Sequence, residues 1–201
     1  MNHNGFIIID IETLSTEPNA MVFAIAAIDH QGKGFMHAVD LDEQRDAGAD
    51  IDPHTVMWWI TQDGKWADRK AADLTIMQRA SVRDDLQALY SDALMDVWVR
   101  GPDFDLPILA NYLGINRADL PWDYWRVRDV RTAEEVTGKI AGNRHPHNPY
   151  EDCLSAGIIV GQFYDIKRME KERLEQINKD RNAAFDNAIA AAGGEIADKI
   201  N

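Results

Sequence analysis

Apolar residues along the first two thirds of the chain form short runs that polar or turn-forming residues separate. The continuous apolar run at Phe6–Ile11 is typical of a strand that is buried on both faces. Runs at Ala20–Asp29 and Phe35–Val39 follow, and the glycine-containing turn between them predicts that the chain opens with a three-strand meander. Later runs at Asp96–Arg100 and Arg126–Val130 predict two further strands.

Apolar residues at helical spacing lie between and after these strands. They predict helices over His54–Thr61, Ser81–Met95, Pro107–Leu113 and Pro149 to about Tyr164. Strands that come first, followed by strands that alternate with helices, favour an α/β fold with helices on the faces of one sheet.

From Asp165 onward the sequence predicts a separate charged helix, interrupted at Gly193-Gly194. Its apolar positions are too sparse for a sustained heptad, so we expect this helix to be solvated or to contact a partner, a second copy in a homo-oligomer included. These positions are Ile166, Met169, Leu174, Ile177 and Phe185. We therefore expect a domain at residues 1–164 and a C-terminal helical extension at 165–201.

The composition adds limits to this picture. The 201 residues are 45% hydrophobic, enough to bury a core, and they carry 34 acidic against 21 basic side chains, a net charge of −13. This charge argues against a basic nucleic-acid surface and against docking on an anionic membrane. The densest acidic run, Asp40–Asp52, is expected to be a solvated loop.

The cysteine content and the N-terminal residues predict the cellular compartment of the protein. The single cysteine, Cys153, excludes an internal disulfide, and its acidic neighbourhood favours a small buried thiol over a reactive one. No apolar run has the ~18 residues of a spanning helix, and the N-terminus lacks a basic segment with a cleavage site. We expect a cytoplasmic protein.

The first acidic pair, Asp10 and Glu12, ends the first predicted strand. Residues two apart on a strand point to the same face, with ~7 Å between them. Two carboxylates at the end of a buried strand are costly unless a cation balances them, and their oxygens suit Mg²⁺ or Mn²⁺. The alternative is a strand that simply emerges into solvent.

Two later stretches carry further candidate groups. Asp105 precedes a predicted helix, where an N-cap would have the same appearance, and Asp103 is close enough to compete with it. Asn148, with a glutamate three residues later, resembles a capping box, which places Asp152 in the first turn of a helix and His147 in the loop before it. Taken alone, His147 and the nearby His145 also fit ordinary surface histidines.

The order of these groups resembles the DEDDh branch of the 3′–5′ exonucleases, an RNase H-like family that includes polymerase proofreading subunits. An Asp-x-Glu on the first strand, a Phe-Asp after a later strand and a His-x-x-x-x-Asp at a late helix make up that pattern. The similarity is greatest to exonuclease A of T-even phages, which suggests a phage or prophage origin. It is carried by Phe6–Thr13, Thr55–Trp59, Arg100–Leu109, Arg128–Thr132 and His147–Cys153.

The resemblance implies an RNase H-like mixed sheet, with a three-strand antiparallel meander plus parallel strands, and a two-metal site. In the family pattern the second aspartate follows an aromatic residue, which selects Asp105 over Asp103. The implied ligands of two Mg²⁺ or Mn²⁺ ions are Asp10, Glu12, Asp105 and Asp152. His147 matches the general base, and a histidine with an ordinary pKa near ~6.5 suits proton transfer from water at neutral pH.

Substrate contacts are expected beside these groups. Thr13 and Leu14 follow the first acidic pair, where the family presents a backbone amide and an apolar wedge to the terminal nucleotide. Phe104 and Trp58 are candidate stacking groups, and stacking is worth ~1–3 kcal/mol per base. Trp58 and its neighbour Trp59 also fit the core side of an amphipathic helix. Three arginines in the similar stretches either contact phosphate or form structural ion pairs: Arg100, Arg128 and Arg131.

The expected reaction is release of 5′-mononucleotides from the 3′ end of single-stranded DNA. The same fold and site serve exoribonucleases, and no residue decides between the two. A non-catalytic nucleic-acid-binding module and a general metal phosphatase are the other classes. We expect substrate to be held by metals and stacking, with weak affinity for duplex and modest salt dependence.

Overall fold

The computed structural model describes residues 5–61, 76–140 and 147–200, with the backbone alone for 188–200. The chain divides into two compact units, Met1–Gly161 and Gln162–Asn201. Among the helices in these described ranges, none combines the length and the apolar character that crossing a bilayer would require.

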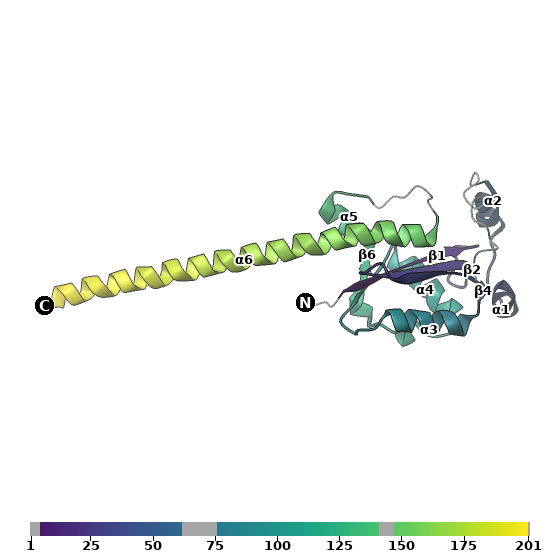
Figure 1. Ribbon diagram of the computed structural model, residues 1–201, viewed down its shortest axis with the longest axis horizontal. Helices are drawn as coiled ribbons and strands as arrows, with labels where there is room; N and C mark the ends of the chain where they lie inside the picture. The colour runs from purple at the N-terminus through teal and green to yellow at the C-terminus, as the bar shows by residue number, and fades with distance from the viewer. Residues whose placement is uncertain (1–4, 62–75, 141–146, 201) are drawn as a thin grey trace. The chain divides into compact units, whose positions relative to one another are not determined.

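A six-stranded mixed sheet in the order β4-β3-β2-β1-β5-β6 runs through the first unit (Figure 1). The predicted meander is confirmed, because β1, β2 and β3 pair antiparallel, while β4, β5 and β6 add in parallel to β3, β1 and β5. The strands are β1 (Phe6–Thr13), β2 (Val22–Asp29), β3 (Gly34–Val39), β4 (Ile76–Met77), β5 (Asp96–Val99) and β6 (Val127–Asp129).

In the described part of the chain, six α-helices accompany the sheet. Figure 1 shows α3 and α4 on one face and the first turns of α6 on the other. Two short 3-10 turns, η2 (Arg117–Asp119) and η3 (Tyr124–Arg126), lead from α4 to β6. The helices are α1 (Leu41–Asp46), α2 (Pro53–Thr61), α3 (Arg79–Leu89), α4 (Pro102–Tyr112), α5 (Val130–Thr137) and α6 (Pro149–Ile200).

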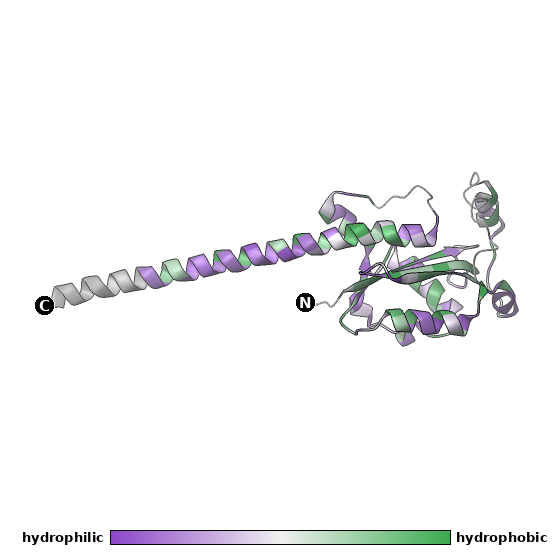
Figure 2. Cartoon of the chain, viewed as in Figure 1, coloured by the Kyte–Doolittle hydropathy of each residue, from purple (hydrophilic) through white to green (hydrophobic). Residues whose placement is uncertain are grey.

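The two faces of β1 are covered differently, since successive side chains of a strand point to opposite sides. Ile7, Ile9 and Ile11 belong to the main hydrophobic core, together with buried residues of α3 and α4. The residues between and after them, Asp10 and Glu12 included, therefore point to the face that the start of α6 covers. In Figure 2, β1 and β2 are mostly green, as expected for strands buried on both faces.

The acidic run at 40–52 is mostly exposed, as expected, but it is not one loop, because it contains the short helix α1 and the residue that caps α2. The Asp40 carboxylate accepts the amides of Asp42 and Glu43 at the start of α1, at 2.9 and 3.2 Å. Asp52 likewise accepts the Thr55 amide at 2.9 Å at the start of α2. Aspartate is a favoured N-cap because its oxygen satisfies an unpaired amide of the first turn.

Helix boundaries differ from the predicted ones at several places. α3 ends at Leu89 because the Tyr90 hydroxyl, bound to the carbonyls of Ala93 and Met95 at 3.2 Å, anchors the turn toward β5. α4 begins at Pro102, five residues before the predicted Pro107, because Gly101 (φ 94°) turns the chain directly from β5 into the helix. Helix α5 was not predicted.

The C-terminal part of the chain also differs from the prediction. α6 is one helix from Pro149 to Ile200, without the expected change near residue 165 and without the break at Gly193-Gly194. A glycine inside a helix costs ~1 kcal/mol relative to alanine, and the alanines at 188 and 190–192 are the strongest helix formers. Helical propensity on the N-terminal side therefore offsets the cost of the two glycines.

Candidate active site

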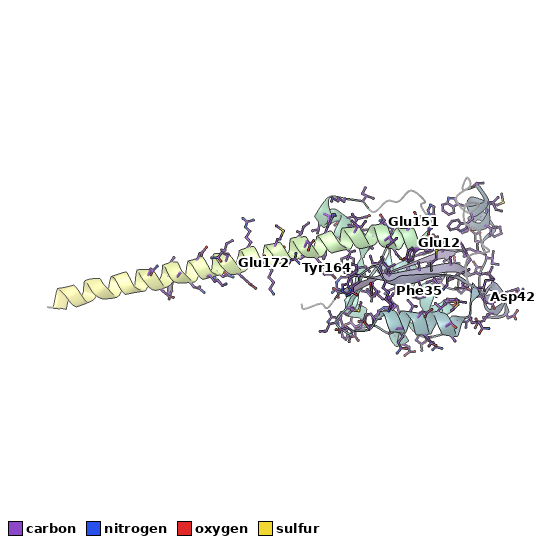
Figure 3. The ribbon with its side chains drawn as sticks, viewed as in Figure 1. Glu12, Phe35, Asp42, Glu151, Tyr164 and Glu172 are labelled. Atoms are coloured by element: carbon purple, nitrogen blue, oxygen red, sulfur yellow. The ribbon has the colours of Figure 1, made fainter. Side chains whose placement is uncertain are left out.

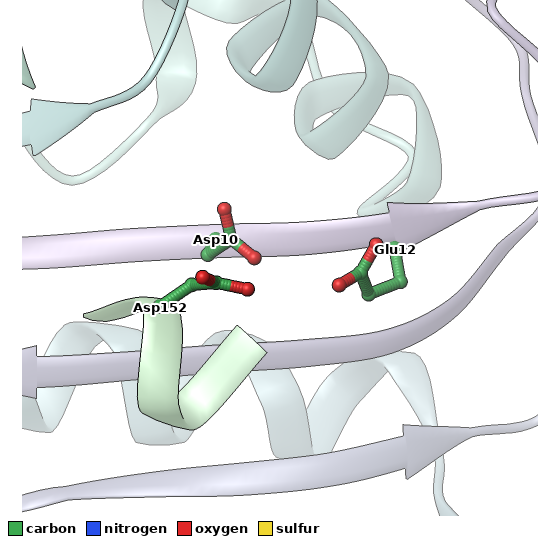
Figure 4. Close-up of side chains that lie close together, drawn as sticks. All are labelled: Asp10, Glu12 and Asp152. Carbon is green, nitrogen blue, oxygen red and sulfur yellow. The ribbon is translucent and has the colours of Figure 1, made fainter. Parts of the chain in front are cut away.

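Three carboxylates meet where β1 passes the start of α6 (Figure 4). Each of Asp10, Glu12 and Asp152 offers an oxygen, and the three oxygens all lie within 4.8 Å of one another. Asp10 and Glu12 share a strand face, and Asp152 comes from the first turn of α6. We call these residues the carboxylate trio.

The sequence at the start of α6 explains why the helix lies so close to the sheet. The predicted N-cap is confirmed, because the Asn148 side chain accepts the amides of Tyr150 and Glu151 at 3.1 and 3.3 Å. Cys153 is fully buried, with its sulfur 3.7 Å from the Ile8 carbonyl oxygen. At Gly157 a Cβ would stand 3.2 Å from the Ile28 side chain, so a larger residue would require this side chain or the helix to shift by a few tenths of an ångström.

The trio lies in a strongly negative environment. Burial, followed by the charges of Asp105 and Asp152, raises the pKa of Asp10 well above its ordinary value, and Arg100 lowers it. Arg100 also forms an ion pair with Glu134, so its charge is shared. Such a cluster of hard oxygen ligands fits a divalent cation, whose positive charge would offset the mutual repulsion of the carboxylates.

Asp105 lies in the first turn of α4 and is 4% exposed. Burial raises its pKa from 3.8 to about 7. Its oxygens are outside the carboxylate trio, but it is close enough for its charge to act on Asp10. The competing Asp103 side chain is fully exposed and lies 4.0 Å from Arg117. Burial beside Asp10 therefore favours Asp105 as the fourth carboxylate, which stays a prediction.

An open cleft of about 450 Å³ adjoins the trio, and Glu12 belongs to both. The cleft is formed by the end of β1, the loop after it, α2 and the residue that caps it, the start of α4 and the loop before α6. Its lining residues are Ile11, Glu12, Thr13, Thr16, Asp52, His54, Thr55, Trp58, Trp59, Phe104 and His147.

His147 enters this cleft from the position just before α6, where the sequence placed it. Its backbone is left-handed, with φ 68°, the only such non-glycine residue among those that the structure describes. Its ring meets the rings of Trp58 and Trp59 edge to face, at centroid distances of 4.9 and 5.6 Å. These contacts hold the imidazole in the cleft that Glu12 also lines. His145 lies outside the described residues.

The two tryptophans of α2 have different surroundings, which the sequence did not separate. Trp59 is fixed, because its indole nitrogen donates to the Thr13 carbonyl at 2.8 Å and its ring packs on Phe23 at 5.2 Å. Trp58 is 42% exposed and lines the cleft, as Phe104 does. Trp58 is therefore the better stacking candidate of the two.

Thr13 and Leu14, which follow the acidic pair Asp10 and Glu12, also have different surroundings. Thr13 lines the cleft, and its hydroxyl donates to the Ser15 carbonyl at 2.7 Å. The Leu14 amide already donates to the Met21 carbonyl at 2.8 Å, and Leu14 is not among the lining residues. Leu14 is thus engaged in the turn between β1 and β2 in this structure.

The three arginines of the similar stretches all have acidic partners. Arg100 pairs with Glu134, Arg128 lies 3.4 Å from Asp96, and Arg131 lies 3.5 Å from Asp129. Arg131 also lowers the pKa of Asp105, and Arg100 that of Asp10, so both lie near the carboxylates.

Sequence reasoning missed the polar residues on the far side of the cleft. His54 and Thr55 stand four residues before Trp58 and Trp59 on α2, so helical spacing could have placed them on the same face. Asp52 gave no such signal, because its role as the α2 cap also fits a residue far from any site.

The fold is that of a known group of nucleases. Two solved structures of E. coli exonuclease I match 78–82% of this chain at 11–12% identity, and the chain spans about two fifths of the length of those proteins. A zinc-bound complex with single-stranded DNA has a TM-score of 0.54 and 12% identity, covering 82% of this chain and 43% of that one. An exonuclease I/SSB-Ct complex has a TM-score of 0.52 and 13% identity, covering 82% and 43%. At these identities the likeness shows the fold alone, an RNase H-like mixed sheet flanked by helices.

A comparison with curated protein sequences found no match. A family model does match: residues 5–157 fit the one described as a 3′–5′ exoribonuclease Rv2179c-like domain. That range contains the carboxylate trio, Asp105, His147 and every residue that lines the cleft. The chain therefore belongs to the Rv2179c-like family of 3′–5′ exoribonuclease domains.

Proposed function

We propose that this protein is a metal-dependent 3′–5′ exonuclease of single-stranded nucleic acid, of the DEDDh type. One observation carries the proposal: the carboxylate trio shares Glu12 with an open cleft that His147 and exposed aromatic rings line. The trio and Asp105 have the donor chemistry for Mg²⁺ or Mn²⁺. Two bound cations would supply stabilisation of the charge on the attacking and leaving oxygens of the phosphodiester.

The remaining roles belong to residues of the cleft. We assign His147 as the group that accepts a proton from the attacking water, since an imidazole can do so at neutral pH. Trp58 and Phe104 would stack on the bases at the 3′ end, and Thr13 would contact the terminal nucleotide. Stacking tolerates any base, so little sequence preference is expected.

We infer that single-stranded RNA is the preferred substrate. The family match that names an exoribonuclease covers the whole site, whereas the likeness to exonuclease I concerns the fold. Thr13, Thr16 and Thr55 line the cleft, and a threonine hydroxyl whose proton is already donated can still accept a hydrogen bond from a ribose 2′-hydroxyl. Single-stranded DNA is the second candidate, favoured by the sequence similarity to the phage exonuclease A proteins, which stays a prediction.

Matched RNA and DNA oligonucleotides, labelled at either end, test the proposal with Mg²⁺, Mn²⁺ or EDTA. We expect stepwise loss of 3′ mononucleotides with metal, no cleavage in EDTA and faster digestion of RNA. Faster loss of DNA would reverse the substrate order. Cleavage that persists in EDTA would contradict the metal requirement.

Variants separate the catalytic proposal from its competitors. Asp105→Asn should abolish cleavage, while Asp103→Asn, two residues away on α4 and exposed, should not. Retention of labelled oligonucleotide in Mn²⁺ without cleavage would indicate a binding module instead. Much faster hydrolysis of a mononucleotide ester than of an oligomer would indicate a phosphatase.

A further inference from the structure

On the described part of α6 beyond the first unit, four of the five exposed large apolar side chains share one stripe, and the fifth, Met169, lies about 60° outside it. The four on the stripe, Ile166, Leu174, Ile177 and Phe185, are 40–66% exposed. With ~3.6 residues per turn, these four and two charged residues, Glu170 and Arg181, fall within an arc of about 100°. We call these six positions the α6 stripe. Most of the helix around them is purple in Figure 2, and Figure 3 shows Glu172 standing out from it.

The intervals between successive residues of the α6 stripe are the same from the N-terminal end as from the C-terminal end. Successive members are 4, 4, 3, 4 and 4 residues apart, so the pattern is symmetric about a point between Glu175 and Gln176. Two copies laid antiparallel about that point would therefore place the four large apolar residues of the stripe level with one another and Glu170 level with Arg181. Lys167 and Ala184, at the two edges of the same arc, would also be level. The level pairs are Ile166 with Phe185, Glu170 with Arg181, and Leu174 with Ile177.

The charges favour this antiparallel arrangement over a parallel one. Glu170 and Arg181 have opposite signs and would meet twice within the stripe, once for each copy. Arg173 and Asp180 lie on the same edge of the stripe and would be about 3 Å apart along the axis, also with opposite signs. A parallel pair in register would instead set Glu170 against Glu170 and Arg181 against Arg181, which costs stability.

The same charges argue against other occupants. Residues 163–201 carry eight acidic and seven basic side chains, so this helix offers phosphate no basic surface. The existing ion pairs of the helix, such as Lys167 with Glu170 at 3.4 Å, are exposed and therefore weak. They would not prevent Glu170 from exchanging its partner.

We propose that the α6 stripe binds a second copy of this chain, forming an antiparallel two-helix homodimer centred between Glu175 and Gln176. The interface is short, so we expect a dimer that dissociates in the micromolar range. The paired charges fix the register, as a polar residue does within a coiled-coil seam.

Sedimentation velocity on the full chain over a concentration series tests the dimer. We expect a mass that approaches twice the 22.7 kDa of one chain as concentration rises. Leu174→Glu should weaken the dimer at least about tenfold, because it buries a charge twice in the seam. The control Ala183→Glu adds the same charge on the opposite side of the helix and should have no effect. A chain that stays monomeric at 200 μM, or equal effects of the two variants, would overturn the proposal.

Charge exchange tests the register. Glu170→Arg and Arg181→Glu should each weaken the dimer, and the two together should restore it, because the level pair regains opposite signs. Failure of the double exchange to restore the dimer would contradict this register.

Disulfide formation tests the direction. In an antiparallel pair of two Ile166→Cys chains, the two new sulfurs lie about 28 Å apart along the helix axis. A sample of Ile166→Cys chains only should therefore not crosslink, and neither should a sample of Phe185→Cys chains only. A mixture of the two variants should crosslink. Crosslinking of Ile166→Cys chains with one another would show a parallel pair. The native Cys153 does not interfere, since it is buried.

Discussion

Asp105 allows a test of the site that needs no substrate. Its carboxyl is 4% exposed, and burial raises its pKa from 3.8 to about 7. Between these two values the folded chain binds a proton that the unfolded chain has released. The stability of the metal-free protein must therefore fall as the pH rises through this window, and it is greatest below it.

The magnitude follows from the size of the shift. A rise in the pKa of Asp105 from 3.8 to about 7 corresponds to a cost of about 4 kcal/mol for holding the carboxyl ionised at pH 8, at ~1.4 kcal/mol for each pH unit. At pH 5 the group is protonated in the folded chain, and the cost falls to about 2 kcal/mol. Asparagine has the shape of the protonated carboxyl and no charge. Asp105→Asn should therefore stabilise the metal-free protein by up to about 4 kcal/mol at pH 8 and by about half of that at pH 5.

Urea unfolding in EDTA, followed by tryptophan fluorescence, measures this difference, because Trp98 is fully buried in β5. The matched control is Asp103→Asn, which changes an exposed carboxyl of the same helix turn and should leave stability unchanged. Saturating Mg²⁺ at pH 8 should stabilise the native protein, by ~2.7 kcal/mol at 100 times its dissociation constant, and the Asp105→Asn variant less. A variant that is less stable than the native protein at pH 8 in EDTA would refute the reasoning, since the ionised carboxyl would then have a compensating partner.

Three further predictions concern other parts of the first unit. His147→Ala should lower the rate of cleavage at pH 7 by ~10²-fold or more. The control is His37→Ala, at a histidine of β3 that does not line the cleft, and near-native turnover of His147→Ala would exclude His147 as the base. Gln44→Met should lower the free energy of unfolding by ~2–3 kcal/mol. The Gln44 side chain accepts from the amide of buried Val22 at 2.8 Å and donates to its carbonyl at 2.7 Å, and methionine can do neither. A loss within ~0.5 kcal/mol in urea unfolding would contradict that role. Cys153 should not react with a thiol reagent in the native protein, since burial raises its pKa and the group is inaccessible; rapid labelling would show that the start of α6 opens.

Several parts of the fold and site could be read from the sequence because the signals are local. The apolar run of β1 predicts burial on both faces, and the i, i+2 relation alone puts Asp10 and Glu12 on one side of it. The N-cap at Asn148 is local too, since it depends on amides two and three residues away. The helix within the acidic run at 40–52 was not predicted, because α1 is held by the long-range pairing of Gln44 with Val22.

The carboxylate trio depends on contacts that no local pattern encodes. Asp152 is 140 residues from Glu12, and it reaches the strand because Cys153 and Gly157 let α6 lie against Ile8 and Ile28. Packing likewise decided between Trp58 and Trp59, since the Thr13 carbonyl and the Phe23 ring contact Trp59, while Trp58 stays 42% exposed.

By itself, the sequence determined the residue types of the site, their order and the strand face of the first pair, because backbone periodicity is a property of neighbouring residues. Only the tertiary structure decided that three carboxylates meet, that Asp105 is the buried aspartate, and which rings line the cleft. The reason is physical: distances between segments far apart in the chain are set by side-chain packing, and small changes there, such as a Cβ at Gly157, would alter them.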